Sequence, residues 1–289
     1  MLEACKILTG HLDEPISDSS IIGTYQLCKF ASKTVKVALG GDGADELFAG
    51  YDPFKALKTA FFFEKLGGKK ISPFLLKFAN SFIPVTHKNI SLDFRIKRFL
   101  KGMTKPWPYR NPSWLSPFTV TQINEALGTN FSNEEIYSES IQLWNNCPQD
   151  NIFDKTLNFY TNIYLKNGIL TKIDRSSMLN SLEVRSPFLD INFVNFVRKI
   201  PHELKFKSGI SKYILKKAVS KILPPSIFLR KKKGFGSPIG NWIKNDKLKI
   251  KPNFNVSNKL LSEHKSNKAD HRLSIFADHM LSGKSYNIT

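Results

Sequence analysis

The pattern of apolar and polar positions near the amino end predicts a helix, a buried strand and a second helix in succession. Residues 18–20 are polar and can cap a helix ending near residue 33, whose apolar face comprises Ile21, Tyr25, Cys28 and Ala31. Residues 34–39 are apolar and rich in β-branched side chains, which is typical of a strand buried in a parallel sheet. A helical pattern resumes at Glu46. This order predicts a partial doubly wound parallel α/β sheet.

The remainder of the chain has the pattern of helices. Prolines divide residues 61–150 into short apolar runs, as in short helices joined by ordered loops. Apolar stripes over 153–164 and 193–200 predict two more helices, and a third is expected from Ser211 with core-facing Ile214, Leu215, Ala218 and Ile222. Residues 245–268 are polar and predict a mobile connection to a last helix over 273–281. We expect a domain over 1–245 with a largely helical carboxy-terminal half. Residues 246–289 would be a polar connection and terminal helix of that domain.

Composition and charge narrow the choice of partners. The 289 residues are 41% apolar, which is enough to bury a core. A net charge of +19 would attract nucleic acid, acidic membranes or polyphosphates. Because the lysines are scattered over nearly every segment, we expect a solvated surface, no nucleic-acid partner and no membrane partner. The apolar run 71–85 is shorter than the ~20 residues that cross a bilayer. Cysteines without disulfide spacing, and the lack of an export signal, predict a cytoplasmic protein.

The sharpest candidate for chemistry is GGDGADELFAGY, residues 40–51, directly after the predicted strand. Its glycines allow the backbone to approach a ligand, and the following helix points its amide groups toward that ligand. Such a loop suits a phosphate, but the carboxylates of Asp42, Asp45 and Glu46 would repel one unless a divalent cation lay between them. Carboxylates beside nucleotide phosphates are the usual arrangement for Mg²⁺. Alone, the segment also fits a tight turn with acidic residues at a helix start.

Four blocks together resemble the synthetase domain of glutamine-hydrolysing asparagine synthases: HLDEPISDSS, VKVALGGDGADELFAGY, LTKIDRSSMLNSLEVRSPFLD, and KYILKKAV with LPPSIFLRKKKGFGSPIGNWI. They follow one another in the family's order over residues 11–243. The resemblance implies a fold of the ATP-pyrophosphatase type and a carbon–nitrogen ligase that uses ATP and Mg²⁺. In the implied reaction, ATP adenylates the side-chain carboxylate of aspartate, and glutamine-derived ammonia then attacks to give asparagine.

The resemblance also implies roles for particular residues. Asp45 would bind Mg²⁺, and Asp42 would occupy the acidic position beside the adenylate and help to organise the second stage. Lys212 would touch the phosphates and stabilise the charge on the departing pyrophosphate, which suits a point cation. Without the family match, Lys212 fits a solvated lysine in the first turn of a helix. The implied ATP-binding residues are Gly40, Gly41, Gly43 and Lys212.

Other charged residues have plainer interpretations. Arg175 and Arg185 lie near acidic residues at helical spacings that favour buried or semi-buried ion pairs, so we interpret them mainly as architecture, with substrate binding as the alternative. The basic run 230–233 fits a nucleic-acid patch, but it also matches the family's own segment. The six histidines show no clustered ligand spacing, so zinc is not expected.

Two departures from the family bear on activity. Full members begin with a glutaminase domain and an SGGxDS loop that wraps pyrophosphate, and we find neither, while Gly40 stands where the family usually has serine. We expect a fragment of a longer synthetase, and a shortened relative that has lost catalysis is the competing explanation. The isolated chain is predicted not to activate aspartate. Alternatives are an amidotransferase for a sugar acid, peptide or β-lactam precursor, and a non-catalytic basic binding module; the oligomeric state, including a homo-oligomer, stays open.

Overall fold

The computed structural model of the chain describes residues 1–88, 91–229 and 234–282, and is mostly helical with two small sheets. The basic run 230–233 lies outside the described residues. The first half contains α1 (Leu2–His11), α2 (Ser20–Ala31), β1 (Val37–Leu39), α3 (Ala44–Leu47), α4 (Asp52–Lys65), α5 (Gly68–Phe82), α6 (Leu92–Met103), α7 (Trp107–Leu115), α8 (Val120–Leu127), α9 (Asn133–Ile136) and α10 (Ser138–Asn145).

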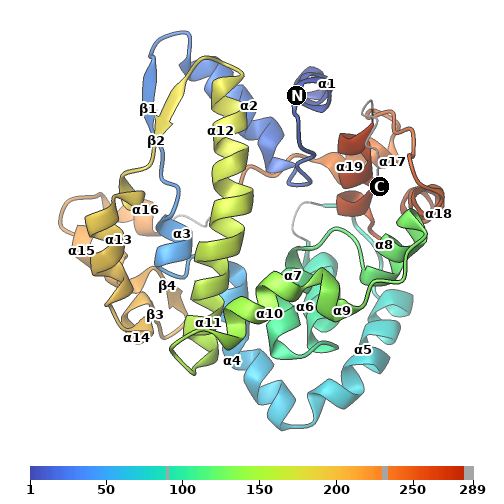
Figure 1. Cartoon of the computed structure of the whole chain (residues 1–289), viewed down its shortest axis with the longest axis horizontal. Helices are drawn as coiled ribbons and strands as arrows, with labels where there is room; N and C mark the ends of the chain where they lie inside the picture. Colours follow the sequence, from blue (N-terminus) through green and yellow to red (C-terminus); the bar gives the residue numbers. More distant parts are fainter. Residues whose placement is uncertain (89–90, 230–233, 283–289) are drawn as a thin grey trace.

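A long helical rod runs through the middle of the molecule (Figure 1). It consists of α11 (Ile152–Phe159), the wider-turned η1 (Tyr160–Leu170) and α12 (Thr171–Met178), which follow one another without a break. After it come β2 (Glu183–Arg185), η2 (Pro187–Leu189), α13 (Ile191–Arg198), α14 (His202–Lys205), β3 (Phe206–Lys207), β4 (Ile210–Ser211), α15 (Tyr213–Val219), α16 (Pro225–Leu229), α17 (Ile239–Lys244), α18 (Asn255–Lys265) and α19 (Arg272–Leu281).

The sheets are smaller than predicted. β1 and β2 pair in parallel, with Val37 opposite Glu183, and β3 pairs antiparallel with β4. The described residues are therefore of α/β composition, but they do not contain a doubly wound sheet. The expectation of a buried strand was wrong, because Val37 is 43% and Leu39 75% exposed. A parallel strand is buried only when other strands and helices cover it, and in the described part of the chain β1 pairs with β2 alone.

Several predicted helices are confirmed, and two details are corrected. α2, η1 and α19 lie where the apolar spacing placed helices. Ala218 and Ile222, expected to face the core, are exposed, Ile222 at 78%. The helix expected from Ser211 spans only Tyr213–Val219, so Ile222 lies beyond its end. Residues 245–268, expected to be a mobile connection, contain α18, whose Val256 and Leu260 are buried. The division of the chain at 245/246 stays a prediction.

Three apolar clusters hold the elements together. The largest joins α1 and α2 to α17, α18 and α19, so segments from both ends of the chain share one core, as Figure 1 shows. A second, aromatic cluster surrounds Phe54 and Tyr160, where α4 meets the long rod. In the third, Leu47 and Phe48 pack against Val197. The second and third clusters together fix the segment that follows the glycine loop.

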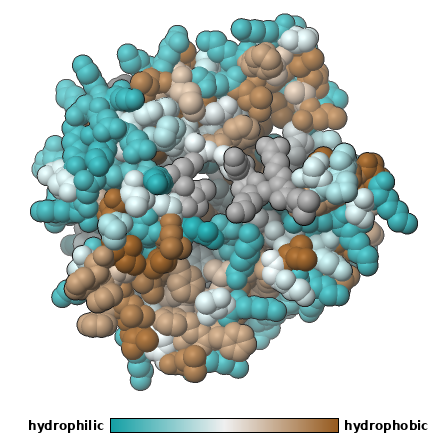
Figure 2. Space-filling model, turned by 180° about the vertical axis from the view of Figure 1, so that it is seen from behind, coloured by the Kyte–Doolittle hydropathy of each residue, from teal (hydrophilic) through white to brown (hydrophobic). Residues whose placement is uncertain are grey.

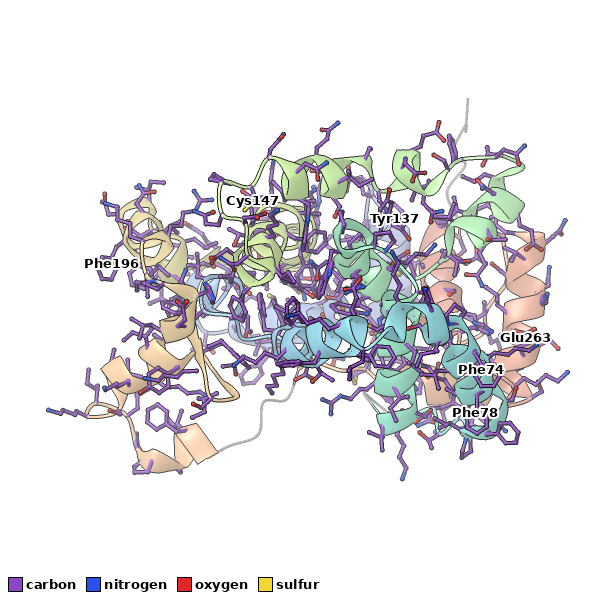
Figure 3. All side chains as sticks on the ribbon, turned by 90° about the horizontal axis from the view of Figure 1, so that it is seen from below. Phe74, Phe78, Tyr137, Cys147, Phe196 and Glu263 are labelled. Atoms are coloured by element: carbon purple, nitrogen blue, oxygen red, sulfur yellow. The ribbon has the colours of Figure 1, made fainter. Side chains whose placement is uncertain are left out.

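The surface carries apolar patches beside its charged groups. In Figure 2 brown atoms gather at lower left, where α5 lies, and at upper right, where α2 and β1 lie. Phe74 and Phe78 extend outward from α5 (Figure 3), and they are 71% and 51% exposed. Among the described residues, no helix combines the length and apolar character needed to span a membrane.

Candidate active site

The glycine loop leaves the carboxyl end of β1 and leads directly into α3. The Gly40 N–H donates to the Arg185 carbonyl at 2.7 Å, so the pairing with β2 continues past the strand. Gly43 has a φ of 91°, and a Cβ on it would overlap the side chain of Leu189, so glycine is required there. A Cβ on Gly41, in contrast, would meet no atom within 4 Å. The loop is fixed at Gly43 and open at Gly41, where the backbone can face a ligand.

Lys212 lies against the acidic loop although the two are far apart in the sequence. Its Nζ is 2.9 Å from Oδ1 of Asp45, and both side chains are 24% exposed. The Lys212 backbone has a φ of 55°, and its N–H donates to the Phe48 carbonyl at 3.0 Å. Gly50 leaves the necessary space, because a Cβ there would overlap both Asp45 and Lys212. The fold brings together the residues predicted to bind metal and phosphate, and their ligand roles stay predictions.

Asp42 turns back over Gly40, with Oδ2 only 2.8 Å from where a Cβ on Gly40 would lie. Burial raises the pKa of the Asp42 carboxyl, and the charge of Lys172 and a hydrogen bond with Ser186 oppose this only in part. A serine at position 40 would crowd this conformation of Asp42. Glycine at position 40 therefore leaves room for the Asp42 side chain.

A buried lysine beside Asp42 was missed by sequence reasoning. Lys172, on α12, is 7% exposed and donates to Asp18 Oδ2 at 2.9 Å and to Ser20 Oγ at 2.7 Å. Burial would raise the pKa of Asp18, but the charge of Lys172 and hydrogen bonds from Lys172 and Ser20 more than offset this and lower it. Lys172 and Asp18 both fall within the blocks that resemble the family. Position in those blocks was a usable signal, whereas a lone lysine in a helix usually suggests a solvated surface.

The burial of Glu46, inside the glycine segment, was not predicted from the sequence. Glu46 is 1% exposed and accepts a hydrogen bond from the Tyr51 hydroxyl, and burial raises the pKa of both groups. The Tyr51 ring lies 5.1 Å from that of Tyr160 and 5.5 Å from that of Tyr164, both on η1. Wider-turned helical segments such as η1 are frequent at functional sites. The long rod thereby supports the loop through Tyr51.

Glu46→Gln is expected to raise the melting temperature at pH 8. A glutamine oxygen can still accept from Tyr51 and carries no charge to bury. The pKa of Glu46 is raised in the folded chain. Its favourable contribution to the stability of the folded state is therefore present below its ordinary pKa, and it is lost as the pH rises through the pKa that Glu46 has in the folded chain. The advantage of the variant should therefore grow with pH in thermal unfolding from pH 4 to 8. Glu139→Gln, at an exposed position on α10, is the control; an advantage that grew toward acid would contradict this account.

The two arginines of the third block form surface ion pairs. Arg175 Nη2 lies 2.9 Å from Asp13 Oδ2, and Arg185 Nε lies 2.7 Å from Glu183 Oε1. Exposed pairs of this kind contribute only about 0–1 kcal/mol, so a substrate carboxylate could displace either partner. Both pairs lie at the surface, so the expectation of buried or semi-buried pairing was wrong. An architectural role and substrate binding by Arg175 or Arg185 both stay predictions.

Comparison with known proteins adds independent findings. Residues 1–272 match the family described as asparagine synthase. Asparagine synthetase [glutamine-hydrolyzing] 1 of Bacillus subtilis is 32% identical over 258 residues, covering 83% of this chain and 36% of that protein. A putative asparagine synthetase [glutamine-hydrolyzing] of Mycobacterium tuberculosis is 28% identical over 245 residues, with the same coverage of both chains. A Penicillium rubens protein named amidase chyE is 26% identical over 258 residues, covering 80% of this chain and 37% of its own length.

The chain thus spans about a third of the length of the curated relatives that it matches. The family match covers the glycine loop, Lys172 and Lys212 together, and the structure brings these segments into one place. The chain belongs to the asparagine synthase family.

Proposed function

We propose that this chain is the synthetase part of an ATP-dependent amide ligase that adenylates the side-chain carboxylate of aspartate and transfers glutamine-derived ammonia to form asparagine. Membership of the asparagine synthase family supports a ligase reaction in general. The observation that supports this specific proposal best is the 2.9 Å pair of Lys212 and Asp45 on the loop that carries Asp42. This pair places a cation suited to a phosphate, Lys212, next to a carboxylate suited to a metal ion, Asp45.

The residues at this point fit a nucleotide with its magnesium ion. Asp45 offers the oxygen ligand that Mg²⁺ prefers, and Lys212 offers a compact cation for a phosphate. Gly41 leaves open space for close approach, with Gly40 and Gly43 shaping the loop around it. When bound, Mg²⁺ would neutralise phosphate charge. Binding of the nucleotide and its metal would open the ion pair between Asp45 and Lys212. The metal would then compensate the charge of Asp45, and a phosphate would compensate the charge of Lys212.

The roles of the protein groups follow from their charges. Lys212 would stabilise the negative charge that develops on pyrophosphate as the aspartate carboxylate attacks the nucleotide. Asp42 lies beside this point, and its raised pKa suits a group that takes a proton from the attacking ammonia. Lys172 would keep Asp42 oriented from its buried position beside Asp18. Binding of the substrate's α-carboxylate by Arg175 or Arg185 belongs to the same proposal.

We further propose that a glutaminase and pyrophosphate-loop region completes the site. The exposed apolar side chains of β1 and α2, among them Leu39 (75%) and Phe30 (72%), are suited to packing against further strands of a sheet. The relatives are about three times as long as the part that matches. The completing region could belong to the same polypeptide or to a separate one.

The test is reconstitution. The chain is assayed alone and together with the remaining glutaminase and pyrophosphate-loop region of the Bacillus subtilis relative, supplied as a fusion or co-expressed. Aspartate-dependent formation of AMP and pyrophosphate is measured. We expect none above background from the chain alone and clear formation by the combination. Formation of AMP and pyrophosphate by the chain alone would show that the predicted inactivity is wrong. If the two parts fold and associate but form no AMP, the proposed reaction is contradicted.

A second candidate substrate class is tested by the same assay. We propose amidation of another carboxylate as the second candidate, because one relative carries the name amidase chyE and not asparagine synthetase. Replacing aspartate with sugar acids, peptides or β-lactam precursors would then restore AMP formation.

For a non-catalytic basic binding module, the net charge of +19 predicts a salt-sensitive mobility shift of DNA or RNA and no effect of ATP on the thermal stability of the chain.

A further inference from the structure

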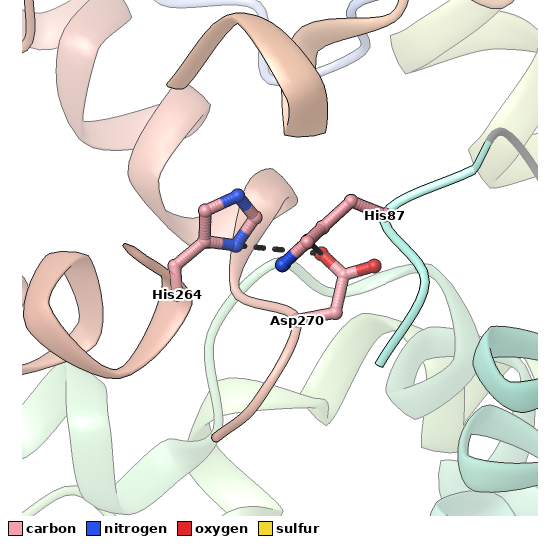
Figure 4. Close-up of side chains that lie close together, drawn as sticks. All are labelled: His87, His264 and Asp270. Carbon is pink, nitrogen blue, oxygen red and sulfur yellow. Dashed lines mark ion pairs between the residues drawn. The ribbon is translucent and has the colours of Figure 1, made fainter. Parts of the chain in front are cut away.

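On the side of the molecule away from α3, two histidines and an aspartate meet in a buried cluster (Figure 4). His87 lies between α5 and α6, His264 on α18, and Asp270 in the connection to α19. Their side chains are 1%, 0% and 6% exposed. Oδ1 of Asp270 lies 3.9 Å from Nδ1 of His87 and 3.6 Å from Nδ1 of His264, and the three atoms all lie within 4.8 Å of one another.

The hydrogen bonds of the other ring nitrogens indicate where the lone pairs are. Nε2 of His264 lies 2.9 Å from the Gly240 carbonyl, and Nε2 of His87 lies 3.1 Å from Oδ1 of Asn267. Both partners are oxygen acceptors, so each Nε2 carries the proton and each neutral ring has its lone pair on Nδ1. Nδ1 of His87 is buried and has no hydrogen-bond partner among the described residues. Nδ1 of His264 accepts the His271 backbone N–H at 3.2 Å, a contact that a bound ion would replace. The unpartnered lone pair of His87, this second lone pair and a carboxylate oxygen therefore face one small volume.

We propose that His87, His264 and Asp270 form a binding site for a transition-metal dication, with zinc as the preferred ion and water completing its coordination. Imidazole nitrogens and a carboxylate oxygen are suitable zinc ligands. Each histidine donates its other N–H to an oxygen, which is how proteins orient metal-binding imidazoles. Ligands at about 2.0–2.1 Å from a tetrahedral zinc ion lie about 3.3 Å apart, so the observed pairs need to close by only a few tenths of an ångström.

Arg272 orients the carboxylate without replacing the ion. Its Nε donates to Oδ1 and Oδ2 of Asp270 at 2.9 and 2.8 Å. Burial would raise the pKa of Asp270, but the hydrogen bonds and charge of Arg272 more than offset this and lower it, so the carboxylate is ionised. Burial lowers the pKa of His87, and lowers that of His264 to about 4, so both rings are neutral at pH 7. None of these contacts places a donor at Nδ1 of His87.

A bound ion would tie the segment after α5 to the carboxy-terminal helices. His87 comes from one side of this junction, and His264 and Asp270 come from the other. An ion that binds only the folded chain adds its binding free energy to stability. The ligands are too far apart in the sequence to form a recognisable motif, which explains why zinc was not expected from the sequence.

The first test titrates the metal-free full chain with Co²⁺ and then with Zn²⁺. We expect one equivalent of Co²⁺ to produce visible absorption bands of a four-coordinate ion, and Zn²⁺ to displace it. Zinc at 100 times its dissociation constant should raise the melting temperature by about 2 °C or more, and a chelator should reverse the rise. A folded chain that gives neither cobalt bands nor a zinc-dependent shift would overturn the proposal.

Two variants locate the site. His87→Asn removes a ring ligand but keeps a side chain that tolerates the φ of 52° at this position, and far-ultraviolet circular dichroism verifies its fold. His202→Asn is the matched control, because the His202 ring faces Asp154 at 3.1 Å and is outside the cluster. We expect cobalt binding to weaken at least 100-fold in the first variant and to be retained in the second. Equal binding by both variants would assign the metal elsewhere and overturn the proposal.

Discussion

Replacing Lys212 with methionine should lower aspartate-dependent pyrophosphate release by about 100-fold or more in the reconstituted enzyme. In the proposed reaction, the cation that faces Asp45 would stabilise the charge on the leaving pyrophosphate. Methionine keeps a chain of similar length and has the same backbone cost as lysine at the positive φ of 55°. The expected loss is in kcat more than in KM for aspartate, because the interaction strengthens as charge develops.

Lys217→Met is the matched control for this variant. Lys217 is on α15, the helix that begins directly after Lys212, and is exposed, so its loss should change the rate by less than about threefold. Thermal unfolding of both variants separates a catalytic effect from a folding effect. If the folded Lys212 variant retained the unsubstituted rate, the role of this lysine in catalysis would be wrong.

Asp45→Asn should lower the same rate by about 100-fold at millimolar Mg²⁺ and should sharply raise the Mg²⁺ concentration required. The substitution removes the charge that both Mg²⁺ and Lys212 would face, while the side-chain shape is kept. Rates measured against Mg²⁺ concentration at saturating ATP test this directly. A normal rate with an unchanged Mg²⁺ requirement would exclude Asp45 as a metal ligand.

Asp52→Asn provides the control for this second prediction, because Asp52 is a 52% exposed carboxylate at the start of α4. The double variant of Asp45 and Lys212 is also informative. Substitutions of two groups that act on the same metal–nucleotide complex have non-additive effects on the rate. The double variant should therefore be little slower than the slower of the two single variants. Effects that multiplied fully would indicate two independent sites.

Local patterns predicted the fold where neighbours in sequence decide the structure. The apolar face beginning at Ile21 and the polar cap before it predicted α2, and Asp18 does accept the Ser20 N–H at 2.9 Å. Glycine content predicted the loop, and Gly43 is required both by its φ of 91° and by Leu189. The extent of the sheet was not predictable in this way, because strand pairing depends on segments distant in the sequence. Burial of α18 likewise depends on contacts with α17 and α19.

The site was predictable only in part. No spacing rule places Lys212 beside Asp45, and only the resemblance to a family put the two residues in one site before the structure showed their ion pair. Lys172 was missed, and Glu46 was named only as one of three acidic residues in the loop, because their burial, at 7% and 1% exposure, is not revealed by a sequence for a single charged residue. His87 and His264 were missed for the same reason, since the fold alone brings them together.

The most direct measurement of the central claim is a crystal structure of the reconstituted protein with Mn²⁺ and a non-hydrolysable ATP analogue, using the anomalous signal of manganese. We expect a manganese peak at about 2.2 Å from a carboxylate oxygen of Asp45, with a phosphate oxygen within hydrogen-bond reach of Lys212 Nζ and the adenylate side of the nucleotide next to Asp42. Nucleotide and manganese bound elsewhere, with the Asp45–Lys212 ion pair still closed, would contradict the account.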